Sequence, residues 1–349
     1  MKAIILEKPG NAVIGDVELP PLKADEVLLR VVTSGICTND VRDFHGECNY
    51  SYPRIGGHEY CGVVEEIGSE VNRRYIDKGM KAVTYIIDDC KTCYYCKRGE
   101  ENICEGLPQT KTFQNADGLS GYCGFAEYVI CKADDMFIYP EDTSFEIMAF
   151  TEPLACVVNS IHRTNIQFGD DVLVIGGGAM GLLHVMAAQL KGARVILSEP
   201  LEQRRKKALE LGCHAVMDPV NCDAVAEVKR LTEGRGATVV FNTTASPAVA
   251  KQAVEMTPPP GGTCVMFSSL HPNDPVPVNM GTIHSYQVTI TGAVSPTIRA
   301  YHQSVLLLGK GLLDPTPLIE GIYDYREFNT AIEVAAKTES YKVLLKFGE

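Results

Sequence analysis

The sequence predicts an α/β protein with two domains, one rich in short β-strands and the other built on a doubly wound parallel sheet. Four consecutive aliphatic residues at 172–175, followed at once by a glycine-rich turn, are typical of a fully buried parallel strand that leads into a helix. Residues 1–90 instead alternate short β-rich runs with Gly, Pro and Asn turns, which indicates an irregular all-β region. A chain of 349 residues also exceeds the ~250–300 residues at which a single core stops growing.

The turn after residue 175 fills a GxGxxG frame with Gly176, Gly178 and Gly181. The first glycine allows a tight turn, the second lets the backbone approach a pyrophosphate, and the third lets the following helix pack against the strand. Met180 lies in the first turn of that helix, whose free N–H groups and positive dipole end suit phosphates. This stretch therefore predicts the dinucleotide-binding half of a Rossmann domain.

A second strand at 193–198 ends beside Glu199, 18 residues after Gly181. A carboxylate at this position accepts hydrogen bonds from the ribose hydroxyls of NAD and repels the 2′-phosphate of NADP, so the sequence favours NAD. Arg204 and Arg205, one helical turn further on, argue in the other direction and make Arg204 a second candidate cofactor-binding residue. The alternative role for Glu199 is to cap the next helix.

Composition and charge narrow the class of partner. The net charge is −12, from 32 basic and 44 acidic residues, and no basic run occurs, which counts against nucleic acid and anionic membranes as partners. No apolar segment approaches the ~20 residues that span a bilayer, and the apolar start of the chain is too short for a signal sequence. Thirteen cysteines in such a chain indicate reduced thiols and metal ligation, so we expect a cytoplasmic protein with a small soluble substrate.

Four of the cysteines, Cys90, Cys93, Cys96 and Cys104, fall within one short loop. Four thiolates so close together suit a closed tetrahedral zinc site, which holds a lobe together and leaves no position open for chemistry. A disulfide-bonded loop is the alternative, and the expected cytoplasmic location counts against it.

Cys37, His58 and Glu59 are a second group of potential ligands, separated in the sequence. Each alone is ordinary, since a single cysteine is usually a small buried hydrophobe and a single histidine a satisfied polar group. Together they offer a thiolate, an imidazole and a carboxylate, which is a catalytic zinc set if the fold brings them together. We interpret the eight cysteines outside these two groups as buried thiols.

With these motifs the chain resembles the zinc-containing medium-chain dehydrogenases/reductases, the superfamily of alcohol, sorbitol and threonine dehydrogenases. The cysteine loop, a GHExxG segment at 57–62, a GFAEY segment at 124–128, an EPLA segment at 152–155 and the glycine-rich turn occur in the order of that family. The resemblance implies a GroES-like β-rich catalytic domain at 1–155 that includes the zinc loop at 90–104, a Rossmann domain at 156–291, and a return to the catalytic domain at 292–349.

The same resemblance assigns roles in a catalytic zinc site. Cys37 and His58 are its ligands, and Glu59 and Glu152 share or exchange the remaining positions. Glu152 is similar to a glutamate of the polyol dehydrogenases, which favours a polyol or sugar-type substrate; its alternative role is that of an acid in the first turn of a helix. The resemblance further implies two zinc ions per chain, one catalytic and one structural, NAD as cofactor, and a homodimer or homotetramer.

Two positions depart from the family. Its members carry a hydroxyl and a histidine for proton relay where this chain has Asn39 and Arg42, so Thr38 or His45 is the candidate substitute. Sorbitol dehydrogenases carry a substrate-binding arginine where Ser295 stands, which weakens sorbitol itself as the substrate.

We therefore predict a zinc-dependent oxidoreductase that transfers a hydride between NAD and a secondary alcohol of a polyol, sugar or sugar derivative. The substrate pocket is expected in a cleft between the domains, near His45, Phe113, Tyr122 and Ser295. The alternatives are an L-threonine-type 3-dehydrogenase, a lyase or epimerase that oxidises its substrate transiently with retained NAD, and a binding protein that has lost turnover.

The remaining patterns predict individual elements of secondary structure. The β-rich region includes strands at 27–32 and 60–64, and a helix at 156–170 leads into the Rossmann domain. Further elements are strands at 237–242, 263–267, 288–291 and 342–347 and helices at 301–308 and 328–336.

Overall fold

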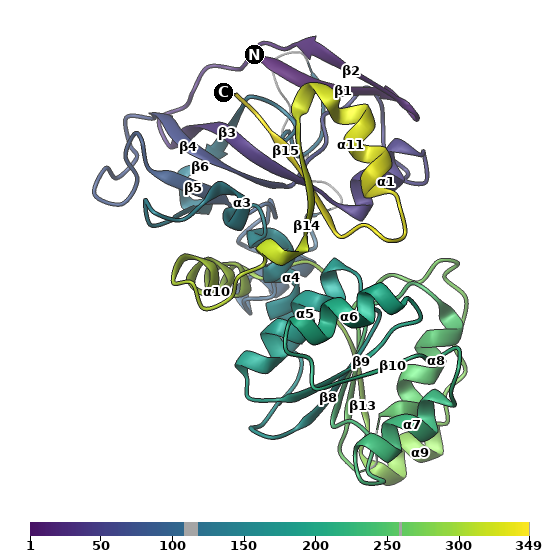
Figure 1. Ribbon diagram of the computed structural model, residues 1–349. Coiled ribbons are helices and arrows are strands. Elements are labelled where there is room, and N and C mark those ends of the chain that lie inside the picture. The colour runs from purple at the N-terminus through teal and green to yellow at the C-terminus, as the bar shows by residue number, and fades with distance from the viewer. Residues whose placement is uncertain (108–117, 258–259, 349) are drawn as a thin grey trace. The chain divides into compact units, whose positions relative to one another are not determined.

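The computed structural model describes residues 1–107, 118–257 and 260–348, which belong to two compact units (Figure 1). One unit consists of Met1–Ala155 together with Thr297–Glu349, and the other is Cys156–Pro296. The chain returns to the first unit five residues later than the predicted boundary at 291/292. Phe113 lies outside the described residues. None of the described helices has both the length and the apolar composition needed to cross a membrane.

The first unit is built on a seven-stranded sheet in which most neighbouring strands are antiparallel. Its longest strand, β3 (Glu26–Ile36), alternates buried and half-buried residues as far as Val32 and is buried throughout beyond it. The strand order is β14 (Ile319–Asp324), β15 (Lys342–Lys346), β3, β4 (Glu59–Ile67), β5 (Lys81–Thr84) and β7 (Met136–Ile138), with β6 (Tyr128–Lys132) paired to β3. A separate hairpin joins β1 (Lys2–Lys8) to β2 (Asn11–Asp16).

The C-terminal strand β15 lies beside β3 in this sheet. Val343 pairs with Ile36 in antiparallel register, so the last residues of the chain lie next to the end of β3. On its other side β15 pairs in parallel with β14, a strand that is absent from the predicted elements. The helices of this unit are α1 (Thr38–Phe44), α2 (Tyr94–Lys97), α3 (Phe145–Met148), α10 (Ile298–Gly309) and α11 (Phe328–Ala335).

Helix α4 (Thr151–His162) is found where a helix at 156–170 is predicted, so both predicted ends are wrong. It begins five residues earlier because Pro153 suits the first turn of a helix, where its missing N–H is not needed. It ends eight residues earlier because the backbone N–H and the hydroxyl of Thr164 both donate to the carbonyl of Ile161.

The second unit is a six-stranded parallel sheet flanked by helices, which confirms the predicted doubly wound fold (Figure 1). Strand β8 (Asp171–Ile175) lies in the middle and is buried along its whole length. The strand order is β10 (Ala215–Met217), β9 (Arg194–Ser198), β8, β11 (Val239–Asn242), β12 (Thr263–Met266) and β13 (Thr289–Gly292). Chain order reverses between β8 and β11, which is where such sheets bind their ligands.

Helices α7 (Ala224–Leu231) and α8 (Pro247–Met256) cover one face of this sheet. Val228 and Met256, from these two helices, are buried against Leu173 and Ile196 of the central strands. The other helices of the unit are α5 (Ala179–Leu190), α6 (Glu202–Glu210) and α9 (Met280–Tyr286).

Gly62 in β4 marks a close approach to β3. A Cβ there would lie 2.0 Å from the carbonyl oxygen of Arg30, which belongs to the backbone. We expect Gly62→Ala to lower the free energy of unfolding by about 1–3 kcal/mol, because the two strands must separate locally. Gly292→Ala is the control, since the nearest atom to its Cβ would be 4.0 Å away. Urea unfolding measures both changes, and equal losses in the two variants would contradict the prediction.

Candidate metal centres and cofactor site

The sheet of the first unit brings Cys37, His58 and Glu59 together at the end of β3. A sulfur, a ring nitrogen and a carboxylate oxygen from these residues all lie within 4.8 Å of one another. Cys37 is the cap residue before α1, Glu59 is the first residue of β4, and His58 directly precedes it. The pairing of Gly35 with Glu59 between β3 and β4 sets this approach. Thiolate, imidazole and carboxylate are ligands that zinc accepts, so the three residues fit the metal.

Asp40 is not among the predicted site residues, yet it contacts two of them. Its carboxylate accepts hydrogen bonds from the backbone N–H groups of Cys37 (2.9 Å) and Gly57 (3.3 Å) and lies 3.8 Å from Nδ1 of His58. Burial lowers the pKa of His58, but the Cys37 thiol and the Asp40 carboxylate outweigh it and raise that pKa well above its usual value. The available signal was an acid at the third position of a helix, where a carboxylate caps the backbone.

Both carboxylate oxygens of Glu59 are held by Lys342 from the C-terminal strand β15. Nζ of Lys342 donates to Oε1 at 2.8 Å, to Oε2 at 2.5 Å and to the carbonyl of Ile36 at 3.3 Å. Only 2% of Glu59 and 4% of Lys342 is exposed. The Glu59 carboxylate passes over Gly35, where a Cβ would come within 2.3 Å of Oε2. Glycine at position 35 is therefore what leaves room for the ion pair.

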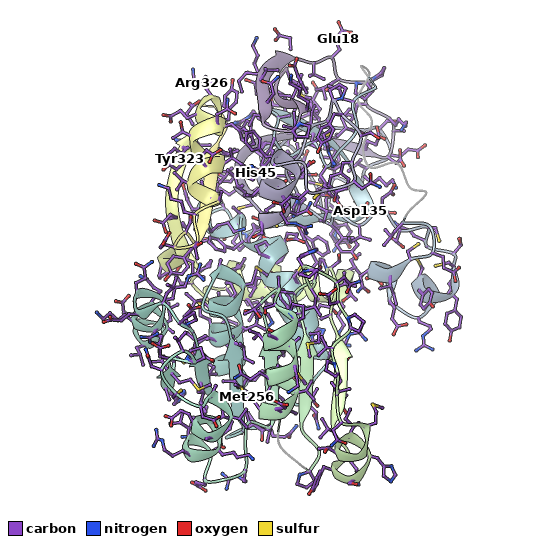
Figure 2. All side chains as sticks on the ribbon, turned by 90° about the vertical axis from the view of Figure 1, so that its right-hand side faces the viewer. Glu18, His45, Asp135, Met256, Tyr323 and Arg326 are labelled. Carbon is purple, nitrogen blue, oxygen red and sulfur yellow. The ribbon has the colours of Figure 1, made fainter. Side chains whose placement is uncertain are left out.

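The other predicted zinc and relay residues lie at different distances from this group. Glu152 is buried in the first turn of α4 and lies outside the group within 4.8 Å, although its charge contributes to the raised pKa of His58. Thr38 is exposed and directly follows Cys37. His45, labelled in Figure 2, is exposed beyond the last residue of α1. Cys37 and His45 cap the two ends of this helix, and the eight residue steps between them, each ~1.5 Å, place His45 about 12 Å along the axis from Cys37.

Asn39 and Arg42, the two departures at the relay positions, both have local partners. The amide of Asn39 donates to the hydroxyl of Tyr50 at 3.3 Å and accepts from the thiol of Cys48 at 3.7 Å. Arg42 pairs with Glu47, with 3.3 Å between nitrogen and oxygen.

The four cysteines of the loop form the second group of ligand atoms. Their sulfurs lie within 4.8 Å of one another, at 3.5 Å for Cys93 and Cys96, 3.8 Å for Cys93 and Cys104, and 4.0 Å for Cys90 and Cys96. Four sulfurs that each lie ~2.3 Å from one zinc ion at tetrahedral angles are about 3.8 Å apart, so the loop fits a closed zinc site. The hydroxyl of Thr92 and nearby backbone N–H groups lower the pKa of Cys90 to about 6, which favours the thiolate form that binds metal.

The prediction of buried thiols for the other eight cysteines is wrong for Cys222. Cys222 is exposed in the turn before α7, where its thiol donates to the carbonyl of Asp218 at 3.1 Å. Cys48 and Cys156 are half-buried, and the remaining five are buried.

In the second unit, the glycine-rich turn connects β8 to α5. Gly176 has a φ of +99°, in the region that favours glycine. A Cβ at Gly181 would lie 1.8 Å from the carbonyl oxygen of Gly176, so only glycine allows α5 to start so close to the turn. Gly178 is the cap residue of α5 and Met180 lies in its first turn. The free N–H groups at this helix start are those that would bind a pyrophosphate.

The structure places Glu199 directly beside the glycine-rich turn. One carboxylate oxygen accepts from the N–H of Gly177 at 2.6 Å, and the other accepts from the N–H of Leu201 at 2.8 Å. Arg204 lies next to it, with 3.7 Å between Nη1 and the carboxylate. Glu199, which favours NAD, and Arg204, which favours NADP, thus lie side by side.

His184 is a buried histidine of this unit that is not among the predicted site residues. Its Nδ1 lies 2.7 Å from the carbonyl of Met180, and its Nε2 lies 2.6 Å from the hydroxyl of Ser160. Since a carbonyl only accepts, Nδ1 carries the proton and Nε2 accepts from the serine. The ring packs against Phe241 and Phe267, at centroid distances of 4.7 and 4.6 Å. Burial lowers its pKa to about 4, so the imidazole is neutral at pH 7.

Sulfur-rich ligand groups and a dinucleotide-type sheet in one chain define a class, that of the metal- and nucleotide-dependent oxidoreductases. Residues 23–141 match the model of the alcohol dehydrogenase GroES-like domain, and residues 179–309 match that of the zinc-binding dehydrogenases. The chain belongs to the zinc-binding alcohol dehydrogenase family of medium-chain dehydrogenases, which confirms the resemblance of its motifs.

Individual relatives cover nearly the whole chain. L-Threonine 3-dehydrogenase of Pyrococcus horikoshii is 30% identical, with 99% of each chain covered, and sorbitol dehydrogenase of Bacillus subtilis is 27% identical, with 99% and 97% covered. Two solved structures align over 99% of each chain. A protein of Sinorhizobium meliloti 1021 described as a zinc-binding dehydrogenase, bound to NADP, has a TM-score of 0.90 and 30% identity. The alcohol dehydrogenase RspB of Escherichia coli CFT073, complexed with NADH, has a TM-score of 0.87 and 27% identity. These likenesses support zinc and a nicotinamide cofactor.

Lys342→Met would leave the charge of Glu59 buried without its cation. We expect this variant, in the presence of a chelator, to lose about 3–5 kcal/mol of unfolding free energy, and the double variant with Glu59→Gln to recover most of it. Lys346→Met, at an exposed position of the same strand, is the control. Urea unfolding of the wild type, Lys342→Met, Glu59→Gln, the double variant and the control gives the coupling, and equal losses at positions 342 and 346 would count against a stabilising pair.

His184 makes the stability of the protein depend on pH. Its folded pKa of about 4 lies below the unfolded value of ~6.5, so its contribution is complete above pH 6.5 and is lost as the pH falls toward 4. Between pH 7 and pH 5 the wild type should lose about 2 kcal/mol of unfolding free energy that His184→Gln does not lose. Urea unfolding at both pH values measures the difference, and an identical loss in the two proteins would exclude this role.

Proposed function

We propose that this protein is a zinc-dependent dehydrogenase that transfers a hydride between NAD and a secondary alcohol of a polyol, sugar or sugar derivative. The observation that carries the proposal is the group formed by Cys37, His58 and Glu59, whose donor atoms lie within 4.8 Å. The fold alone hosts many functions, whereas this donor set in a zinc-binding dehydrogenase is specific to metal-assisted chemistry.

Residues of the first unit have separate roles at the proposed catalytic zinc ion. Zinc bound there supplies a Lewis acid that eases loss of the alcohol proton. Cys37 and His58 hold the ion. The Asp40 carboxylate, 3.8 Å from Nδ1 of His58, is proposed as the outer carboxylate that would orient the imidazole when zinc is bound.

The two candidate carboxylate ligands have different surroundings. Lys342 competes for Glu59, because it already bonds both of that carboxylate's oxygens. We therefore assign the resting carboxylate position to Glu152, with Glu59 as the group that exchanges into it. The four cysteines at 90–104 are proposed to hold a second, structural zinc ion, because their sulfur separations match a tetrahedral site.

Glu199 supports NAD as the cofactor. Each of its oxygens uses one lone pair on a backbone N–H, and a second lone pair remains for a ribose hydroxyl. Arg204 lies beside Glu199 and is the cation that a 2′-phosphate would meet. Both NAD and NADP therefore belong in the test.

The relatives support a substrate with neighbouring polar groups. Sorbitol and threonine, for which two of them are named, each carry a secondary alcohol next to a carbon with a second polar group. An L-threonine-type 3-dehydrogenase is accordingly the second candidate. A lyase or epimerase that retains NAD is a candidate from another class, because Asn39 has an amide where the family relays a proton through a hydroxyl.

The test is reduced-cofactor absorbance with zinc-loaded protein, NAD or NADP, and a panel of polyols, sugars, sugar phosphates and L-threonine, with products identified by mass spectrometry. We expect NADH in polyol or sugar wells. Cys37→Ala should lower turnover by more than about 100-fold and bind one zinc ion fewer, because losing a ligand costs more than losing an outer partner. Cys222→Ala, at an exposed thiol, should change neither.

Each of the other possible results would support a different function or overturn the proposal. Turnover of L-threonine alone would support the second candidate. A changed product without net NADH would support transient oxidation. Reacting wells that are equally active with Cys37→Ala, or no reaction in any well, would overturn the proposed function.

A further inference from the structure

Tyr122 lies against the imidazole of His58 in the first unit. The two ring centroids are 5.3 Å apart, and the ring planes meet at 51°. The side chain is only partly buried. None of the hydrogen bonds found among the described residues involves its hydroxyl. Within residues 1–107, 118–257 and 260–348, Tyr122 therefore offers an unbonded hydroxyl next to a proposed zinc ligand.

The backbone on both sides of Tyr122 is held in place by residues 55–57. Gly121 has a φ of +127°, and a Cβ there would lie 1.9 Å from the carbonyl oxygen of Ile55. Cys123 has a φ of +62°, which is unfavourable for a residue other than glycine. The N–H of Cys123 donates to Ile55 at 3.3 Å, and that of Gly124 donates to Gly57 at 3.1 Å. The GHExxG segment and the Tyr122 segment are thus fixed to each other.

A strained residue that persists inside a well-bonded segment points to a functional constraint. Here the strain at Cys123 and the close approach at Gly121 orient one side chain, that of Tyr122, toward His58. A tyrosine hydroxyl is protonated near neutral pH, so it can both donate and accept a hydrogen bond.

We propose that Tyr122 is a specificity-determining residue whose hydroxyl binds the polar group on the carbon next to the one that is oxidised. This inference rests on the proposed function. It selects substrates in which the alcohol is followed by a hydroxyl or amino group. A simple secondary alcohol has no such group, so it gains nothing from this contact. The selectivity follows because a matched hydrogen-bonding group gains a favourable contact that a simple alcohol cannot make.

Tyr122→Phe tests the inference because it removes the hydroxyl and keeps the ring over His58. For the best polyol of the panel we expect KM to rise about five- to tenfold, with kcat changed less. For 2-butanol, KM should stay within about twofold of the wild type. Tyr75→Phe, at a tyrosine that is 63% exposed, is the control and should leave both KM values unchanged. Calorimetric binding of the polyol to the zinc-loaded protein without cofactor gives a second readout, which should weaken by the same factor.

The two proposals fail in distinguishable ways. If the wild type oxidises no alcohol, the proposed function fails before the variant is compared. If the wild type oxidises polyols and Tyr122→Phe leaves KM and the binding constant unchanged, the role of Tyr122 is excluded. An equal rise in KM for the polyol and for 2-butanol would show that the residue acts through packing on His58, and would also overturn the inference.

Discussion

The first unit, which carries Cys37, His58 and Glu59, depends on one buried ion pair, between Glu59 and Lys342. A buried charge is tolerated only when it is paired, so Glu59 requires β15 to be docked beside β3. The same ammonium group bonds the carbonyl of Ile36, the residue before Cys37, and Glu59 directly follows His58. One contact thereby positions the two segments that carry the proposed zinc ligands. Lys342 of β15 is therefore part of this group of residues.

Patterns that act over a few residues were predictable from the sequence. The glycine frame at 176–181, the cysteine spacing at 90–104 and the parallel strands each reflect local requirements of turn geometry, ligand reach or burial. The sequence predicted a site at Cys37, His58 and Glu59 only if the fold brings them together. Whether it does depends on which residues of β3 and β4 face each other. Lys342 lies 283 residues from Glu59 along the chain, and no local pattern links the two. The predicted C-terminal end of α4 was wrong for a related reason. The hydroxyl of Thr164 donates a hydrogen bond to the carbonyl of Ile161, and the helix ends there although the sequence pattern predicted that it continues.

Glu199 shows why a motif does not determine a single role. The sequence leaves two roles open, ribose acceptor or helix cap, and the structure shows the carboxylate bonded to the backbone of both the glycine turn and Leu201 at the start of α6. These contacts do not exclude the ribose, because a carboxylate has about four acceptor sites. They do mean that Glu199 also shapes the turn. A change of cofactor preference at this position would therefore alter the binding loop as well as its charge.

The four-cysteine loop is connected through α10 to the start of α4, the helix that carries Glu152. Glu101, between Cys96 and Cys104, is buried and accepts a hydrogen bond from the N–H of Ile298 in the first turn of that helix. A carboxylate suits this position because the start of a helix carries free N–H groups and a partial positive charge. Further along α10, the hydroxyl of Ser304 donates at 2.8 Å to the carbonyl of Thr151, the residue before Glu152. A metal that ordered this loop would thus also stabilise, through α10, the start of the helix that carries Glu152.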